Sequence, residues 1–257
     1  MSNEVQNLLD ISRKTALIAL DKLIELGRED VKHYSFDVNI PREIKAVADT
    51  VIEKIILEQL LPTGVDILSE ESGLLHGDNS SSLRFIIDPI DGTVNFVRGI
   101  ANCSISIALF DGNKALFGVI ASYPNGTLAW GGKNLGAFLN DKKLKVSTID
   151  DPKKGVLCTG FPSRFSFDTK STSSQINLMS QFGKTRMLGS ASQSLLQVAK
   201  GSVECYTEQE IMLWDVAAGI AIVEGAGGRV KKIQGSSTDS FNVIADNGRI
   251  NLDTIGW

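Results

Sequence analysis

Two aspartates three positions apart, Asp88 and Asp91, lie in the string Asp-Pro-Ile-Asp-Gly-Thr, which directly follows an apolar run at residues 85–87. The proline and glycine of this string favour a turn, so both carboxylates can face one centre with the Ile90 carbonyl between them. Carboxylate and carbonyl oxygens are the ligands that Mg²⁺ prefers in proteins. The string therefore predicts a divalent-cation site at the end of a strand, although the same residue types also favour an ordinary turn.

The residues that follow, Gly92 and Thr93, can begin a short helix. Backbone N–H groups at a helix N-terminus attract anions through unpaired donors and the helix dipole. One short segment can therefore offer cation ligands and a phosphate-binding backbone side by side.

Two other segments also place carboxylates at the ends of predicted elements. Glu70 and Glu71 follow the apolar residues 65–68, where a solvated acidic loop is an alternative interpretation. Asp215 stands at the start of an apolar helical segment, where a helix N-cap is the favoured local interpretation. An aspartate at a helix start can still project toward a cation.

These residues are positioned by elements that hydropathy periodicity and turn signals predict. Helices are expected over residues 4–26, 43–61, 171–182, 192–200 and 215–224. Strands are expected over residues 65–68, 83–87, 103–110, 115–122, 127–131, 156–159, 185–188, 203–206 and 242–245. The pattern indicates an α+β half with an antiparallel sheet at residues 1–150 and an α/β half at residues 151–257, joined in one compact body.

The composition of the 257-residue chain excludes several classes of protein. Its formal net charge of −4 gives no basic footprint for nucleic acid. Two histidines are too few for an imidazole-rich zinc site, and three cysteines without Cys-x-x-Cys spacing suit a reducing compartment. The longest apolar runs are far shorter than the roughly 20 residues of a membrane helix, and the N-terminus does not resemble a secretory signal. We expect a cytoplasmic protein without a membrane or nucleic-acid partner.

The carboxylate segments occur in a recognisable order along the chain. They are Ser69-Glu70-Glu71, then Asp88 to Thr93 with Asn95-Phe96, then Trp214-Asp215-Val-Ala-Ala-Gly219. In these motifs the chain resembles the inositol monophosphatase family, which belongs to the magnesium-dependent, lithium-sensitive phosphatases together with fructose-1,6-bisphosphatases. The resemblance implies a layered α-β-α-β-α sandwich and a homodimer or larger homo-oligomer.

The resemblance also assigns roles near the cations. The implied ligands of two or three Mg²⁺ ions are Glu70, Asp88, the Ile90 carbonyl, Asp91 and Asp215. Glu70, Thr93 and Asp49 are implied to hold or support the attacking water. Glu43 and Asp37 are alternatives to Asp49, because the family often has a threonine where this chain has Ala46.

A further set of residues is implied to contact the substrate. It comprises Gly92, Thr93, Arg186, Gly189, Ser190, Ala191, Glu208 and Asp215. Gly92 and Thr93 would donate amides to the phosphate, and Arg186 would meet a second anionic group. Simpler interpretations are open for two of them: Arg186 as a solvated strand end, and Ser190 as the cap of the helix that follows.

The implied reaction is Mg²⁺-dependent hydrolysis of a small phosphorylated polyol or sugar by metal-activated water. Inositol 1-phosphate and fructose 1,6-bisphosphate are the expected substrates. A nucleotidase acting on 3'-phosphoadenosine 5'-phosphate and a non-catalytic binding protein on the same scaffold are the alternatives. Every core ligand position is filled, which favours the enzyme.

Overall fold

The computed structural model describes residues 2–28, 34–36, 44–78, 81–163 and 165–251. Asp37 and Glu43, the two alternatives to Asp49, lie outside the described residues. The helices are α1 (Asn3–Arg28), α2 (Val47–Leu60), α3 (Thr93–Val97), α4 (Thr169–Ser180), α5 (Ala191–Ala199) and α6 (Leu213–Gly225), with short 3₁₀ helices at Leu61–Thr63 and Pro152–Lys154.

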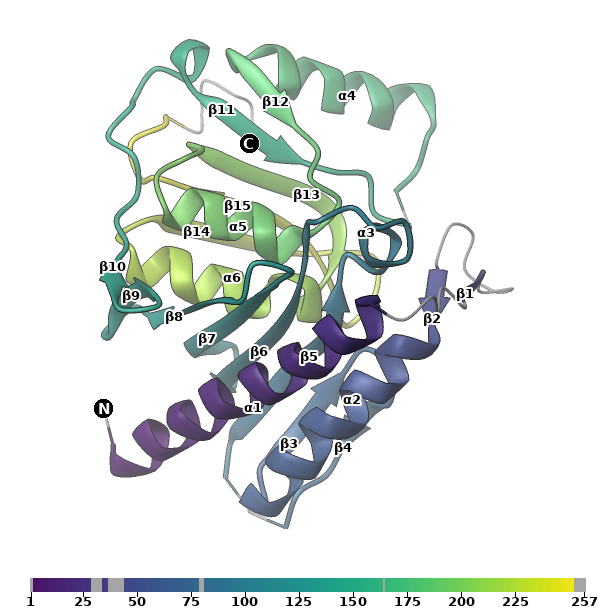
Figure 1. The fold of residues 1–257 in the computed structure, drawn as a ribbon. Coiled ribbons are helices and arrows are strands. Elements are labelled where there is room, and N and C mark those ends of the chain that lie inside the picture. Colours follow the sequence, from purple (N-terminus) through teal and green to yellow (C-terminus); the bar gives the residue numbers. More distant parts are fainter. Residues whose placement is uncertain (1, 29–33, 37–43, 79–80, 164, 252–257) are drawn as a thin grey trace.

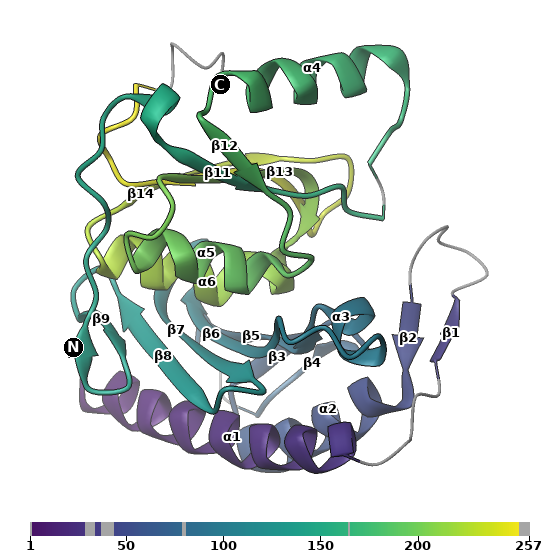
Figure 2. The same cartoon turned by 45° about the horizontal axis from the view of Figure 1, so that its top comes forward.

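Five layers are stacked in the fold (Figures 1 and 2). Helices α1 and α2 cover the outer face of a large sheet, α5 and α6 lie between this sheet and a second one, and α4 covers the far face of the second sheet. The expected α-β-α-β-α sandwich is therefore confirmed.

The large sheet has eight strands in the order β10-β9-β8-β7-β6-β5-β3-β4. They are β3 (Asp66–Ser69), β4 (Gly73–Leu75), β5 (Leu83–Asp91), β6 (Cys103–Asp111), β7 (Lys114–Tyr123), β8 (Thr127–Gly132), β9 (Gly136–Leu139) and β10 (Lys142–Lys143). Its pairs are antiparallel as expected, except that β3 runs parallel to β5. This parallel pair puts the carboxyl ends of β3 and β5 at the same edge.

The second sheet has five strands in the order β12-β11-β13-β15-β14. They are β11 (Val156–Thr159), β12 (Lys184–Arg186), β13 (Cys205–Met212), β14 (Arg229–Gln234) and β15 (Ser240–Asp246). Strand β11 is parallel to β12 and β13, whereas β15 is antiparallel to β13 and β14. A separate two-stranded ribbon pairs β1 (Tyr34–Phe36) with β2 (Ile44–Ala46).

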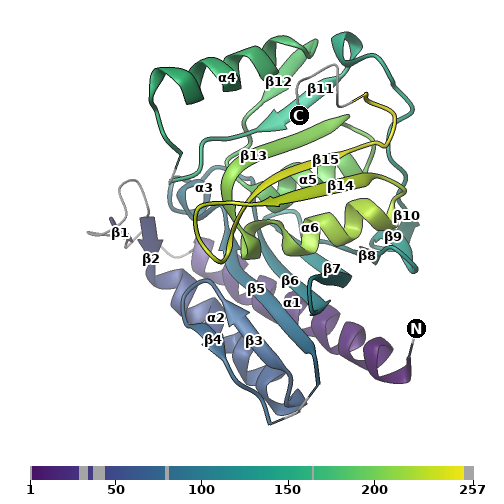
Figure 3. The same cartoon turned by 180° about the vertical axis from the view of Figure 1, so that it is seen from behind.

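Some predicted boundaries are wrong. The helix expected from residue 43 begins at Val47, because residues 44–46 form β2. The strand expected to end at residue 87 continues to Asp91 through a register shift between Asp88 and Asp91, where Pro89 needs no ladder hydrogen bond. Strands β1, β4, β9, β10 and β14 were not predicted. Figure 3 shows β14 at an edge of its sheet. Its sequence is largely polar and its side chains are partly or fully exposed, so it lacks the apolar pattern of a core strand.

Alternation along β5 divides the core between two layers. Phe85 and Ile87 pack with α1 and α2 on one face, while Ile86 packs toward α5 and α6 on the other. All three side chains are fully buried. Because both faces are covered, the strand reads as a continuous apolar run that delivers Asp88 to the sheet edge.

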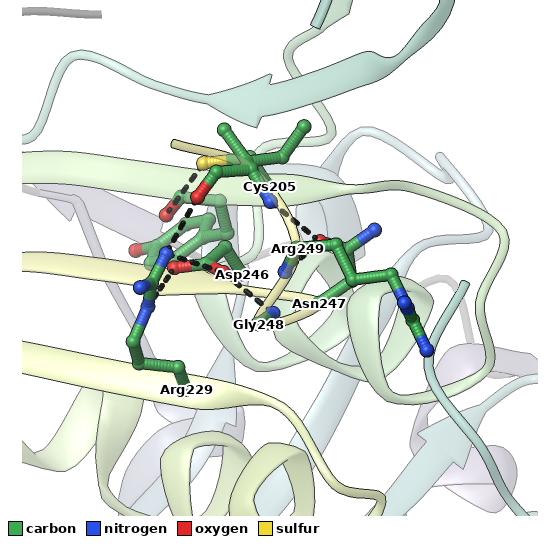
Figure 4. A network of polar contacts seen from close by, with 8 residues as sticks. Cys205, Arg229, Asp246, Asn247, Gly248 and Arg249 are labelled. Carbon is green, nitrogen blue, oxygen red and sulfur yellow. Dashed lines mark hydrogen bonds and ion pairs between the residues drawn. The ribbon is translucent and has the colours of Figure 1, made fainter. Parts of the chain in front are cut away.

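An ion pair between the buried Asp246 and the partly exposed Arg229 fixes the chain after β15 (Figure 4). Asp246, which is completely buried, accepts hydrogen bonds from Arg229 Nε and Nη2 at 3.1 Å each and from the Gly248 N–H at 2.6 Å. Arg229 Nη2 also donates to the Ile250 carbonyl at 2.7 Å. These partners satisfy a carboxylate that would otherwise be costly to bury, and they join the segment after β15 to β14.

The contact between α6 and β7 leaves no room for a side chain at Gly118. A Cβ there would lie 2.1 Å from the Ala218 carbonyl oxygen. We expect Gly118→Ala to lower the free energy of unfolding by about 3 kcal/mol, because backbone must move to relieve the overlap. Urea denaturation measures this loss.

The control is Gly112→Ala in the turn of the same hairpin, where a Cβ would have no neighbour within 4 Å and φ is +55°. Its cost should be limited to backbone strain of about 1 kcal/mol. Equal losses in the two variants would contradict the close packing of α6 on β7.

Candidate active site

Three carboxylates converge at the edge where β3 and β5 end. Glu70 follows β3, Asp88 lies near the end of β5, and Asp215 lies in the first turn of α6. One carboxylate oxygen from each lies within 4.8 Å of the others. The parallel pairing of Ser69 with Ile87 and the packing of α6 on β5 bring these distant segments together.

The charges of these three carboxylates, of which Asp88 is buried and Glu70 and Asp215 are partly buried, repel one another. The pKa of Asp88 is raised well above its usual value by burial and then by the charges of Glu70 and Asp91. Burial also raises the pKa of Glu70, with further contributions from Asp215 and Asp49. The Asp88 Oδ1 atom is buried without a hydrogen-bond partner in the described part of the chain. Clustered carboxylate oxygens with an unsatisfied member fit a hard divalent cation such as Mg²⁺.

Asp91 faces a different set of partners. Its carboxylate accepts hydrogen bonds from Ser190 Oγ at 2.5 Å, the Ala191 N–H at 3.2 Å and the Ser192 N–H at 2.7 Å, and also from Ser192 Oγ. Burial raises its pKa, and these donors oppose that rise. The donors lie in the first turn of α5, so Asp91 joins that helix to β5. Its role as a cation ligand stays a prediction.

Thr93 lies between two oxygen atoms. Its Oγ1 is 3.2 Å from Asp49 Oδ1 and 3.0 Å from the Ile90 carbonyl oxygen. Burial raises the pKa of Asp49 to about 7, although the N–H of Ala46, 2.8 Å from Oδ2, opposes the rise. The structure thus places Asp49 beside Thr93, and the role of this pair in holding water stays a prediction.

Asp49 and Asp215 occupy equivalent positions in their helices. Each is the third helical residue and accepts the backbone N–H of the residue that caps the helix, Ala46 at 2.8 Å and Met212 at 3.2 Å. The interpretation of Asp215 as an N-cap is therefore wrong. Helix α6 begins directly after β13, two residues before Asp215, so no loop separates them.

Glu53 holds the loop that carries Glu70. Its carboxylate accepts hydrogen bonds from the Ser72 N–H at 3.0 Å, Ser72 Oγ at 2.8 Å, and Ser69 Oγ. Sequence analysis assigned no role to this residue. The available signal was its spacing of four from Asp49, which places both side chains on one face of α2.

The turn at Gly92 is confirmed as the start of a short helix, α3. Gly92 has φ +94°, and a Cβ there would lie 3.1 Å from both the Gly189 carbonyl oxygen and Cys103 Cβ. Glycine is therefore required both by the backbone conformation and by the close approach of the 189 segment.

The segment before α5 is tied to α3 and to the loop after it. Asn95 Nδ2 donates to the carbonyls of Leu188 at 2.8 Å and Gly189 at 3.3 Å. Ser190 caps α5, with its side chain accepting the Gln193 N–H at 3.3 Å. The capping interpretation of Ser190 is confirmed. Substrate contacts by residues 189–191 stay predictions.

The two remaining candidate residues differ in their surroundings. Glu208 on β13 is only 8% exposed, and its pKa is raised to about 8 by burial and then by Asp91. Arg186 is exposed at the end of β12, and its Nη1 donates to the Thr185 carbonyl at 2.9 Å. The structure therefore associates Glu208 electrostatically with Asp91, and it leaves Arg186 at an exposed strand end.

Known proteins share this architecture. Residues 4–255 match the inositol monophosphatase family. The chain is 35% identical to the chloroplastic phosphatase IMPL1 of Arabidopsis thaliana over 82% of its own length, and spans 62% of that longer relative. It is 29% identical to the fructose-1,6-bisphosphatase/inositol-1-monophosphatase of Thermococcus kodakarensis over 97% of this chain and 96% of that one. The crystal structure of extragenic suppressor protein suhB from Bartonella henselae matches with a TM-score of 0.84 at 31% identity, covering 95% of each chain.

Fold, carboxylate site and relatives together define a phosphoric monoester hydrolase. More specifically, the chain belongs to the inositol monophosphatase family.

Proposed function

We propose that this protein hydrolyses phosphate monoesters of small polyols or sugars, with inositol 1-phosphate and fructose 1,6-bisphosphate as substrates and Mg²⁺ as cofactor. The observation that carries the proposal is the convergence of Glu70, Asp88 and Asp215, together with the burial of Asp88 Oδ1 without a hydrogen-bond partner among the described residues. Names given to the relatives support both substrates.

The cation residues in this proposal are Glu70, Asp88, Asp91 and Asp215 with the Ile90 carbonyl, holding two or three ions. When bound, Mg²⁺ neutralises phosphate oxygens and lowers the pKa of a bound water. To bind a cation, the Asp91 side chain would have to rotate away from the hydrogen-bond donors at the start of α5.

Water is oriented by the pair Thr93 and Asp49. The Thr93 hydroxyl is held by the Ile90 carbonyl oxygen or by Asp49, so it presents a fixed oxygen to a water on its open side. Asp49, with a pKa near 7, can accept a proton from that water at neutral pH. Glu70 would hold either this water or the cation that binds it.

Substrate contacts follow from the neighbouring segments. Backbone amides of Gly92 and Thr93 would bind phosphate oxygens at the start of α3. Residues 189–191 and Glu208 would meet the hydroxyls of the polyol or sugar. At neutral pH the carboxyl of Glu208 keeps its proton and can donate to a hydroxyl oxygen. Arg186 would meet the second phosphate of a bisphosphate.

The test is phosphate release from inositol 1-phosphate, fructose 1,6-bisphosphate and 3'-phosphoadenosine 5'-phosphate, each with Mg²⁺, with Mg²⁺ plus Li⁺, and with a chelator. We expect Mg²⁺-dependent release from the first two that Li⁺ inhibits. Release only from the nucleotide would favour the nucleotidase alternative. No metal-dependent release from any of the three would overturn the enzyme assignment of this site.

We further propose a cytoplasmic homodimer or larger homo-oligomer. Ile100 and Met187 are 52% and 48% exposed, and the hydrogen bond from Asn102 to the Leu188 carbonyl at 2.7 Å links the loops that carry them. An exposed apolar pair of this kind fits an interface with a second copy.

The three cysteines are unpaired and buried, as suits a reducing compartment. Among the described helices, none has the length and apolar character needed to cross a bilayer.

A further inference from the structure

Glu210 has an unusual backbone conformation. Its φ is +58°, and Asn140, at +53°, is the other non-glycine residue with positive φ in the part of the chain that the structure describes. Asparagine tolerates the left-handed region, whereas glutamate rarely adopts it. Such a conformation persists where the surrounding structure enforces it, and it is concentrated at functional sites.

The residue lies in a bulge of β13. The register with β15 shifts between Glu208 and Ile211, and the strand runs to Met212, after which α6 begins directly. The bulge therefore separates Glu208, on the proposed substrate side, from Asp215, on the proposed cation side. A bulge turns the side chains that flank it, so its geometry sets how these two carboxyls are aimed.

The side chain of Glu210 fixes the bulge to the turn between β14 and β15. Its carboxylate accepts the Ser236 N–H at 2.9 Å, Ser236 Oγ at 2.6 Å and Ser240 Oγ at 3.1 Å. Its own N–H donates to Asn242 Oδ1 at 3.0 Å. Both the backbone and the side chain of this residue are therefore held by one hairpin.

The same turn also holds the start of α6. The Leu213 N–H, in the first turn of that helix, donates to the Asp239 carbonyl at 2.8 Å. The turn thus contacts the bulge on one side and the helix that carries Asp215 on the other.

We propose that Glu210 is a positioning residue that sets Glu208 and Asp215 relative to each other by clamping the bulge of β13 to the 235–240 turn. The functional consequence rests on the proposed function, in which Glu208 meets the substrate and Asp215 holds a cation. In this proposal Glu210 itself contacts neither the substrate nor the cation.

Glu210→Gly is the informative variant, because glycine adopts the left-handed conformation without strain and lacks the carboxylate clamp. Glu210→Gln is the conservative comparison, since its amide oxygen can still accept the Ser236 N–H. Asn140→Gly is the matched control, because it also removes a hydrogen-bonding side chain at positive φ. The Asn140 Oδ1 accepts the Leu128 N–H at 3.0 Å. Asn140 lies in the turn between β9 and β10, at the opposite edge of the large sheet from β3.

Three measurements are made on the full chain: kcat and KM for inositol 1-phosphate, the Kd for Mg²⁺ alone by calorimetry, and hydrogen exchange of the Leu213 amide without metal or substrate. In Glu210→Gly we expect KM and the Mg²⁺ Kd each to rise about tenfold, with faster Leu213 exchange. Glu210→Gln should remain within about threefold of the parent and should rescue most of the loss. Asn140→Gly should match the parent in all three.

Parent-like KM, Kd and Leu213 exchange in Glu210→Gly would overturn the proposal, and so would a change in thermal stability alone. If the parent hydrolyses none of the phosphate esters, the proposed function fails, while the Mg²⁺ Kd and the Leu213 exchange still decide the role of Glu210. If the parent binds no Mg²⁺, the exchange of the Leu213 amide decides whether the clamp exists.

Discussion

Asp88→Asn should lower Mg²⁺-dependent phosphate release by about a thousandfold and at the same time stabilise the metal-free protein. The loss of activity follows because a bound cation supplies several kcal/mol of transition-state stabilisation, and about 4 kcal/mol corresponds to a factor of about a thousand. The gain in stability follows because the pKa of Asp88 is raised by burial and by neighbouring Glu70 and Asp91, so its charged form destabilises the fold. A neutral amide of nearly the same shape removes that repulsion.

The measurements are kcat with saturating substrate over a range of Mg²⁺ concentrations, and urea denaturation at pH 8 in the presence of a chelator. Asp111→Asn is the matched control, because Asp111 ends the neighbouring strand β6 at its exposed end and accepts a hydrogen bond from Ser82 Oγ at 2.5 Å. That variant should keep parental activity. An Asp88→Asn protein with undiminished Mg²⁺-dependent turnover would remove Asp88 from the cation site.

Asp91 is a less informative position for this substitution. Its carboxylate oxygens accept hydrogen bonds from two hydroxyls and two backbone amides at the start of α5. An asparagine there would turn an N–H₂ group toward some of these donors, so the variant would lose both stability and activity. The two losses could then not be told apart. Asp88 separates the two effects, because its Oδ1 accepts no hydrogen bond from the residues that the structure describes.

Local signals in the sequence were sufficient to predict a cation site at Asp88, whereas the resemblance to a family was needed to add Glu70 and Asp215 to it. Residues 85–87 are buried on both faces of the large sheet, so their apolar run predicts the strand that delivers Asp88. The turn glycine at 92 and the apolar helix after Asp215 are equally local. The layered fold, by contrast, came from the resemblance to a family rather than from periodicity.

The residues that sequence analysis missed act through partners far away in the chain. Glu53 accepts hydrogen bonds from Ser69 and Ser72, and Glu210 accepts them from Ser236 and Ser240. Each is an ordinary glutamate until the tertiary fold supplies its donors. The left-handed conformation of Glu210 contradicts the local preference of the residue, so no local pattern could have predicted it. Asp215 was misplaced for a related reason, since the direct passage from β13 into α6 leaves no loop signal before the helix.

In the absence of divalent cations, the protein should lose stability as the pH rises from about 4 to about 8, and Mg²⁺ should reverse this loss most strongly at the alkaline end. Burial raises the pKa of Asp49 from 3.8 to about 7 and that of Glu208 from 4.5 to about 8. In the unfolded chain both groups ionise near pH 4. Between these limits the folded state binds more protons than the unfolded state, so the free energy of unfolding falls with rising pH. For Asp49 alone the fall is on the order of 4 kcal/mol.

Other shifted carboxyls do not reverse this trend. A hydrogen bond from the Gly77 N–H lowers the pKa of Asp66, and the Ser166 hydroxyl lowers that of Asp168. Because their folded pKa values are depressed, their stabilising contributions are complete above the usual carboxyl pKa and are lost only in stronger acid. The raised pKa values of Glu70 and Asp88 act in the same direction as those of Asp49 and Glu208.

Mg²⁺ binds ionised carboxylates, so its binding releases protons and strengthens as the pH rises. A ligand that binds only the folded state stabilises it by an amount that grows with the ratio of its concentration to its Kd, and the Mg²⁺-induced rise in stability should therefore be larger at pH 8 than at pH 5.5. Thermal and urea unfolding at both pH values, with Mg²⁺ and with a chelator, measure this rise. In Asp88→Asn the Mg²⁺-induced rise in stability should be small at both pH values. Two results would contradict this prediction: a metal-free free energy of unfolding that increases from pH 5.5 to pH 8, or a Mg²⁺-induced rise in stability of equal size at both pH values. Either result would show that these carboxyls are already ionised in the metal-free fold. The cation would then not compensate for the repulsion between their charges.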